Sequence, residues 1–274
     1  MKIDGIEYTI SSGNIYKDLG FLDAKERLAK AKLTMKAEEE ELELTSLKQL
    51  SEDWDNNLRE VYMLIEKTKT YVKSILEKDA SGHDWWHIHR VHKLAKHLAE
   101  KEGANVLVVE LAAILHDISD WKMNGGDDEL GPKLAFEWLT ENKVTKEIAE
   151  HVANIIRTMS FKGAQVKDAM ATLEGKIVQD ADRLDAIGAI GIARTFAYGG
   201  HKGRLMYHPG QKPEMHASFE DYKKNQSHTI NHFYEKLLLL KDRMNTNTAK
   251  KIAEKRHDIM QKYLADFFSE WDFY

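Results

Sequence analysis

The sequence predicts an all-α protein, and two observations lead to this prediction. Only three prolines occur in 274 residues. Between them, apolar and charged residues alternate at steps of three and four, which places apolar side chains on one face of a helix. Cysteine is absent, so disulfides, thiolate metal sites and a cysteine nucleophile are excluded. A metal site in this chain would have to use histidines and carboxylates.

The N-terminal part differs in composition from the rest. A possible strand pair covers residues 3–10, and a charged stretch then runs to Glu41. Such a charge run is typical of a solvated helix face or a tether. We therefore predict a small appendage of unknown role over residues 1–54 and one helical domain over residues 55–274.

The first helices of this domain follow from their apolar spacing and their breaks. A helix over 55–78 ends at Ala80-Ser81-Gly82, and a second over 84–102 is closed by Gly103 as a C-cap. The segment 106–115 is nearly apolar throughout, so it should form a central helix surrounded by others.

The remaining elements are predicted in the same way. Pro132 suits the first turn of a helix over 131–142. A helix at 174–198 contains Gly188 and Gly191, which indicate close packing or a break inside it. The residues between Gly199 and Pro213 form an irregular loop of a length that often carries function. The other predicted helices cover residues 146–158, 218–245 and 248–271.

The overall charge and hydropathy limit the classes of binding partner and the cellular location that we expect. Lys and Arg total 40 against 45 Asp and Glu, a net charge of −5, so no nucleic-acid partner is expected. The mean hydropathy is −0.54, no apolar run approaches the roughly 20 residues that cross a bilayer, and the N-terminus lacks the apolar core of a signal peptide. We expect a cytoplasmic protein without a membrane partner.

Three short segments contain the residues that could bind a metal or take part in catalysis. His87 and Arg90 project from one helix face, His116-Asp117 ends the apolar helix, and Asp182 lies in an otherwise apolar helical segment. The two imidazoles and two carboxylates of His87, His116, Asp117 and Asp182 suit one divalent ion, with water completing the coordination. We expect Mn²⁺ foremost, with Co²⁺, Fe²⁺, Zn²⁺, Ni²⁺ or Mg²⁺ as alternatives.

His87-x-x-Arg90, His116-Asp117 and Asp182 resemble the signature of the HD-domain superfamily of metal-dependent phosphohydrolases. Residues 58–272 are most similar to its bacterial YedJ/YpgQ-type group, through segments such as 83–87, 159–163 and 177–196. The resemblance implies an HD-type helical bundle, metal ligation by these two histidines and two aspartates, and a small phosphorylated substrate, namely a nucleotide.

Further roles follow from the resemblance and from the residue types. Asp120 stands where related nucleotidases place an acid that orients or deprotonates the attacking water, although it also suits a helix cap. Arg90 can clamp a phosphoryl oxygen. Lys162, Lys202 and Arg204 are cations for a polyphosphate tail, or else solvated surface charges.

Three more aspartates have alternative roles. Asp84 suits either an N-cap or an acceptor that fixes an imidazole tautomer. Asp180 and Asp185 lie on other helix faces than Asp182, so we predict that they cap or bridge rather than bind metal.

These inferences predict a metal-dependent enzyme that hydrolyses nucleoside triphosphates, preferably deoxy forms, to the monophosphate and pyrophosphate. A monophosphatase or another phosphoesterase is the nearest alternative, since it needs only the metal and Arg90. A second alternative is a regulatory protein with a structural metal site. A third alternative is a metal oxygenase on a similar scaffold, with His151 as an additional ligand.

Overall fold

The computed structural model describes residues 2–3, 6–7, 22–76, 84–119, 129–159, 170–214 and 227–273. Regular structure in these ranges is almost entirely α-helical, which confirms the predicted fold class. The chain divides into two compact units, residues 1–62 and 63–274, and each is considered by itself. Within the described ranges, no helix combines the length and the apolar character needed to cross a membrane.

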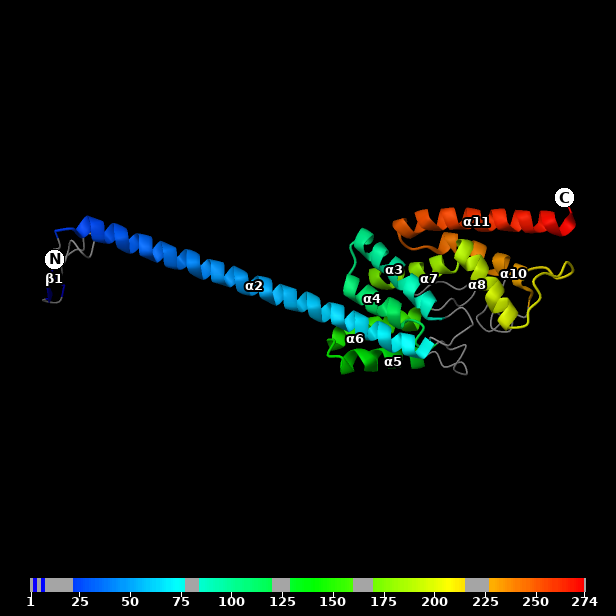
Figure 1. The fold of residues 1–274 in the computed structure, drawn as a ribbon, viewed down its shortest axis with the longest axis horizontal. Coiled ribbons are helices and arrows are strands. Elements are labelled where there is room, and N and C mark those ends of the chain that lie inside the picture. Colours follow the sequence, from blue (N-terminus) through cyan, green and yellow to red (C-terminus); the bar gives the residue numbers. More distant parts are fainter. Residues whose placement is uncertain are drawn as a thin grey trace. The chain divides into compact units, whose positions relative to one another are not determined.

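The first unit contains a short hairpin and most of a long helix (Figure 1). Strand β1 (Lys2–Ile3) pairs antiparallel with β2 (Ile6–Glu7), at the start of the strand segment predicted over residues 3–10, of which residues 4–5 and 8–10 lie outside the described ranges. Helix α2 (Ala24–Leu76) begins well before the predicted residue 55. The reason is that no proline or glycine interrupts residues 21–81, which are rich in strong helix formers. Side chains 32–46 are exposed, as in a solvated helix face.

The second unit holds the remaining helices. Four of the first five match the predicted ranges within a residue or two, and the fifth matches the start of its predicted range but ends at Asp185. Asp84 caps the first of them by accepting the His87 backbone N–H at 2.9 Å, and Gly103 ends it with a φ of 73°. The five helices are α3 (Trp85–Glu102), α4 (Val106–Leu115), α5 (Leu130–Glu141), α6 (Lys146–Thr158) and α7 (Leu173–Asp185).

Helix α4 forms the centre of this unit, as its apolar sequence predicted. Every residue from Val108 to Leu115 is buried, and the helix packs against α3, α6 and α7 (Figure 1). Its C-cap is His116. The core therefore fixes the position of His116 through the helix that ends there.

The predicted helix at 174–198 is broken at Ala186 and Ile187, one of the two alternatives that its glycines indicated. Helix α8 (Gly188–His201) starts with Gly188 at a φ of +76°, a conformation that favours glycine. Gly191 then approaches the Ala186 carbonyl so closely that a Cβ would lie 2.2 Å from its oxygen. The two glycines thus permit a sharp corner between α7 and α8.

The single helix predicted at 218–245 is wrong where the structure describes it. Helix α10 (Thr229–Glu235) stops at Lys236 and is followed by two 3-10 turns, η1 (Leu237–Leu239) and η2 (Lys241–Arg243). Asp180 binds the backbone N–H groups of Asn245 and Thr246, which holds this part of the chain in a non-helical path. The last helix, α11 (Asn247–Asp272), confirms the prediction for 248–271.

Candidate metal centre

Three elements of the second unit bring the four predicted ligands together. His87 lies in the first turn of α3 and is fully buried. His116 caps α4, and Asp117 follows it in the next turn. Asp182 comes from the last turn of α7, and its side chain is 39% exposed. The cluster is thus anchored in the core on the histidine side and open to solvent on the Asp182 side.

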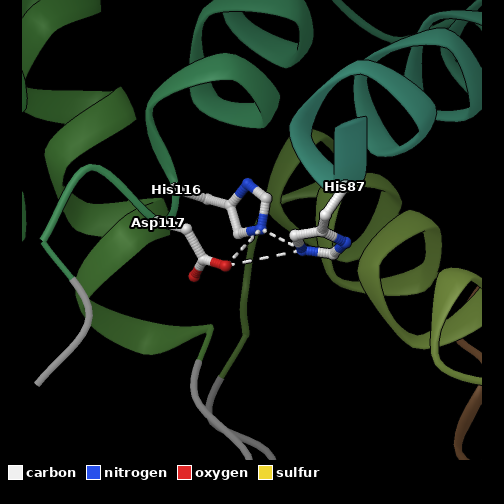
Figure 2. Close-up of side chains that lie close together, drawn as sticks. All are labelled: His87, His116 and Asp117. Atoms are coloured by element: carbon white, nitrogen blue, oxygen red, sulfur yellow. Dashed lines mark hydrogen bonds and ion pairs between the residues drawn. The ribbon is translucent and has the colours of Figure 1, made fainter. Parts of the chain in front are cut away.

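The ligand atoms converge closely. The Nε2 atoms of His87 and His116 lie 3.2 Å apart, and Asp117 Oδ2 lies 3.4 Å from the first and 3.6 Å from the second (Figure 2). Asp182 Oδ1 is 3.4 Å from His87 Nε2 and 3.9 Å from His116 Nε2. His87, His116 and Asp117 can therefore reach one small ion together, and Asp182 lies beside the two histidines.

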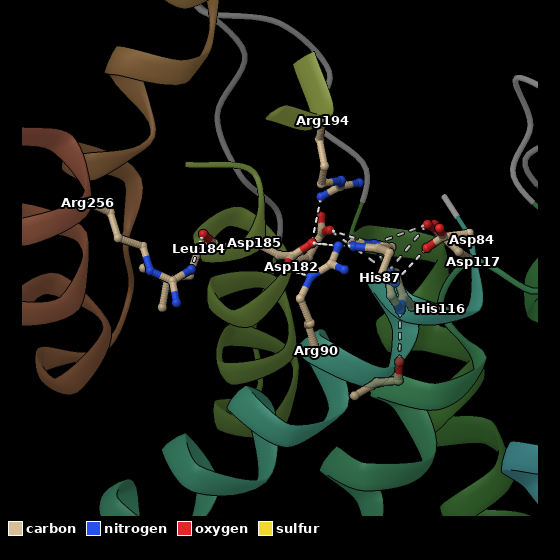
Figure 3. A network of polar contacts seen from close by, with 11 residues as sticks. Asp84, His87, Arg90, His116, Asp117, Asp182, Leu184, Asp185, Arg194 and Arg256 are labelled. Carbon is tan, nitrogen blue, oxygen red and sulfur yellow. Dashed lines mark hydrogen bonds and ion pairs between the residues drawn. The ribbon is translucent and has the colours of Figure 1, made fainter. Parts of the chain in front are cut away.

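The contacts of the two Nδ1 atoms determine which nitrogen of each imidazole faces the ligand cluster. His116 Nδ1 contacts the Ala113 carbonyl oxygen at 2.9 Å, and His87 Nδ1 contacts Asp185 Oδ2 at 2.7 Å (Figure 3). Both partners are acceptors, so each Nδ1 carries a proton. In the neutral form of each ring, Nε2 then directs a lone pair toward the Nε2 of the other ring and toward the two carboxylates.

This donor set fits a divalent cation. Two imidazole nitrogens and two carboxylate oxygens are typical ligands of Zn²⁺, Mn²⁺, Fe²⁺ and Co²⁺. Metal–ligand bonds of about 2.0–2.2 Å place neighbouring ligand atoms about 3.0–3.6 Å apart, which covers most of the separations here. Without a cation, four electron-rich atoms would face one another at short range.

The electrostatics of the cluster agree with this fit. Burial and the positive charge of Arg194 act to lower the pKa of His87. Hydrogen bonds to the carboxylates of Asp117, Asp182 and Asp185 outweigh both effects and raise the pKa of His87 to about 10. The cluster therefore attracts positive charge at His87 Nε2, where either a proton or a metal ion satisfies it.

Asp185 connects the cluster to two arginines. Its carboxylate is 5% exposed and accepts bonds from Arg90 Nε at 2.7 Å, Arg90 Nη2 at 3.0 Å and Arg194 Nη1 at 2.8 Å (Figure 3). Burial acts to raise the pKa of Asp185, but the bonds from His87 and Arg90 hold it well below its usual range. Asp185 thus bridges, as predicted, and Arg90 is tied to it rather than projecting freely toward a substrate.

Sequence reasoning missed Arg194. A signal existed, because Arg194 is the only charged residue between Asp185 and His201. A lone arginine in an apolar helix indicates a buried acidic partner. The partner itself, Asp185, was visible only as one of three acids in α7.

The other sequence candidates lie elsewhere. Lys202 and Arg204 follow the end of α8 and stack near the Tyr198 ring, at 5.7 and 5.8 Å from its centroid. Lys202 is eight residues beyond Arg194, or about 12 Å along a helix. His151 Nε2 lies 3.9 Å from a Glu174 oxygen on α7 and not among the ligands. Asp120 and Lys162 lie outside the described residues.

The comparisons with known proteins agree with the fold. The HD domain family model matches residues 85–187, a span that contains all four candidate ligands. The chain belongs to the HD-domain superfamily of metal-dependent phosphohydrolases. It is thus a hydrolase that uses a divalent metal. This result disfavours the two alternatives of a purely regulatory protein and an oxygenase.

Within the superfamily the chain is of the YpgQ type. YpgQ of Bacillus subtilis strain 168 is 43% identical over 201 residues, which cover 73% of this chain and 89% of YpgQ. The crystal structure of YpgQ in complex with ADP has 38% identity and a TM-score of 0.59, and the match covers 75% of this chain and 97% of that one. An HD-superfamily hydrolase from Bacillus thuringiensis has 51% identity and a TM-score of 0.60, with 77% and 98% covered.

Proposed function

We propose that the enzyme binds one divalent metal, preferably Mn²⁺, through His87, His116, Asp117 and Asp182, and hydrolyses nucleoside triphosphates to the monophosphate and pyrophosphate. Deoxynucleotides are the preferred substrates. The observation that carries the metal assignment is the convergence of His87 Nε2, His116 Nε2 and Asp117 Oδ2 within 3.2–3.6 Å, with Asp182 Oδ1 at 3.4 and 3.9 Å from the two Nε2 atoms. The ADP complex of YpgQ supports a nucleotide ligand with more than one phosphate.

The protein's own residues prepare the site for this reaction. The Ala113 carbonyl and the Asp185 carboxylate hold the two rings with Nε2 toward the ligand cluster. The partial exposure of Asp182 gives a substrate access to one side of the cluster. When bound there, a divalent ion supplies a Lewis acid for a phosphoryl oxygen and lowers the pKa of a water molecule.

Positive charge beside the ligands suits a polyphosphate. Arg90 uses Nε and Nη2 for Asp185, so Nη1 remains to donate to a phosphate oxygen, and its side chain is 34% exposed. A guanidinium held in this way is oriented before the substrate arrives. We assign Asp120 to orienting or deprotonating the attacking water and Lys162, Lys202 and Arg204 to the distal phosphates, as the sequence predicts.

Product analysis tests the reaction. The purified enzyme would be incubated with nucleoside and deoxynucleoside mono-, di- and triphosphates in the presence of Mn²⁺, Co²⁺ or Mg²⁺, and the products separated by ion-exchange chromatography. Pyrophosphate and nucleoside monophosphate in equal amounts are expected from triphosphates. Release of nucleoside and orthophosphate from a monophosphate, with triphosphates left intact, would overturn the proposal in favour of a monophosphatase.

A further inference from the structure

Arg194 reaches the metal centre from a helix outside the region that the HD family model matches. The match ends at residue 187, and α8 begins at Gly188. The Arg194 side chain is 18% exposed and donates from Nη1 to Asp185 Oδ2 at 2.8 Å. The end of the HD match therefore does not mark the end of the structure that supports the site.

The same oxygen of Asp185 serves a candidate metal ligand. Asp185 Oδ2 contacts His87 Nδ1 at 2.7 Å, and Arg90 approaches both oxygens of the carboxylate from α3. A carboxylate can turn about its last side-chain bond, for which the rotamer preference is weak. Arginines on α3 and α8 approach this carboxylate together and limit that rotation (Figure 3).

The sharp corner before α8 brings Arg194 to this position. Gly188 takes a positive φ, and Gly191 lies directly against the Ala186 carbonyl. Arg194 follows Gly191 by about one helical turn. A side chain at Gly191 would meet the Ala186 carbonyl and push α8 away from the end of α7, and Arg194 away from Asp185. A side chain at Gly188 would be strained by the positive φ and would meet Arg256 of α11.

We propose that Arg194 is a positioning residue of the metal centre, which acts through Asp185 to hold the His87 imidazole with Nε2 toward the bound ion. The inference rests on the proposed ligand set and adds α8 to the structure that maintains it. Carboxylates that orient metal-binding histidines contribute about 10–100-fold to metal affinity. Loss of the arginine should cost a similar or smaller factor, because Arg90 still holds Asp185.

Metal binding by Arg194 variants tests this role directly. The measurements are the Mn²⁺ dissociation constant, by isothermal titration, and the visible absorption spectrum of the Co²⁺ form, which reports ligand geometry. Arg194→Met should weaken Mn²⁺ binding by about 5–50-fold and change the Co²⁺ spectrum. Arg194→Lys keeps one cation and should recover part of the affinity.

Arg256→Met is the matched control. Arg256 of α11 donates to the Leu184 carbonyl, next to Asp185 in the chain, but makes no hydrogen bond to Asp185 (Figure 3). Its loss should leave the Mn²⁺ affinity and the Co²⁺ spectrum unchanged. In an Asp185→Asn background, Arg194→Met should have little further effect, because both changes act through one carboxylate.

The outcomes separate this inference from the proposed site. If the wild-type protein binds no divalent metal, the ligand set itself is wrong. If the wild type binds Mn²⁺ and Arg194→Met binds it equally well, the inference is overturned and the ligand set stands. Should Arg194→Met fail to fold in a urea titration with chelator, Arg194→Lys decides, and an affinity equal to that of the wild type would then overturn the inference.

Discussion

Two aspartates of α7, separated by one residue, should respond in opposite ways to the same isosteric change. Asp180 and Asp182 project from opposite faces of the helix, since two residues correspond to about 200° of rotation. Asp180 is fully buried, and its carboxylate accepts four hydrogen bonds of 2.8–2.9 Å, two from Asn245 and two from Thr246. Asp182 faces the ligand cluster. Asp180→Asn should therefore lose stability, and Asp182→Asn should lose metal.

The magnitude for Asp180→Asn follows from these donors. If the new amide NH₂ replaces Oδ2, the Thr246 hydroxyl can rotate to accept from it, but the Thr246 backbone N–H loses its acceptor. An unsatisfied buried donor costs about 1–3 kcal/mol, and the remaining bonds lose the contribution of the charge. We expect the free energy of unfolding to fall by about 2–4 kcal/mol, mainly through loosening of the start of α11.

The assay measures two quantities on each variant. Urea titration followed by circular dichroism, in the presence of a chelator, gives the free energy of unfolding without any contribution from bound metal. Isothermal titration with Mn²⁺ gives the affinity. Asp180→Asn should keep its affinity within a few-fold. Asp182→Asn should keep its stability within about 1 kcal/mol, as is usual for a partly exposed side chain, and lose more than about 100-fold in affinity, beyond the range for residues that only support a ligand. Reversed phenotypes, or equal losses of metal, would refute the reasoning.

Three further predictions test other parts of the site and fold. His116→Ala should lower metal stoichiometry and turnover together while the helical circular dichroism signal persists; full metal occupancy in this variant would contradict the ligand assignment. Asp120→Asn should retain metal but lose about 100-fold or more in turnover, within the range of general acid–base groups, whereas unchanged turnover would return Asp120 to a capping role. Burial acts to raise the pKa of Glu110, but the 2.8 Å bond from His92 and the nearby Lys96 lower it overall. Its stabilising contribution should be present above the unfolded value of about 4.3 and be lost as the pH falls through the lower folded value. The urea midpoint of the wild type should then fall more steeply below about pH 4.3 than that of Glu110→Gln.

Most helices of the second unit and the candidate ligands could be predicted from the amino-acid sequence. Helix periodicity, Gly103 and the apolar segment that ends at His116 are local signals, and the structure confirms the elements that they predict. The ligands could be selected because histidines and aspartates in buried helical positions require partners, whatever the arrangement of the helices. The role of residues 1–54 and the function of the ligand set stay predictions.

The different roles of the three acids of α7 depend on how the helices pack and could not be predicted from the sequence. Asp180, Asp182 and Asp185 look alike in sequence, yet they contact the start of α11, the ligand cluster and two arginines, respectively. The same holds for the segment before α11, which the hydrophobic pattern predicted as helix but which forms turns and ends in two residues bound by Asp180. The partners of Asp180 and Asp185 are 9 to 98 residues away along the chain, and a local pattern contains no information about which distant donors the packing of helices will deliver.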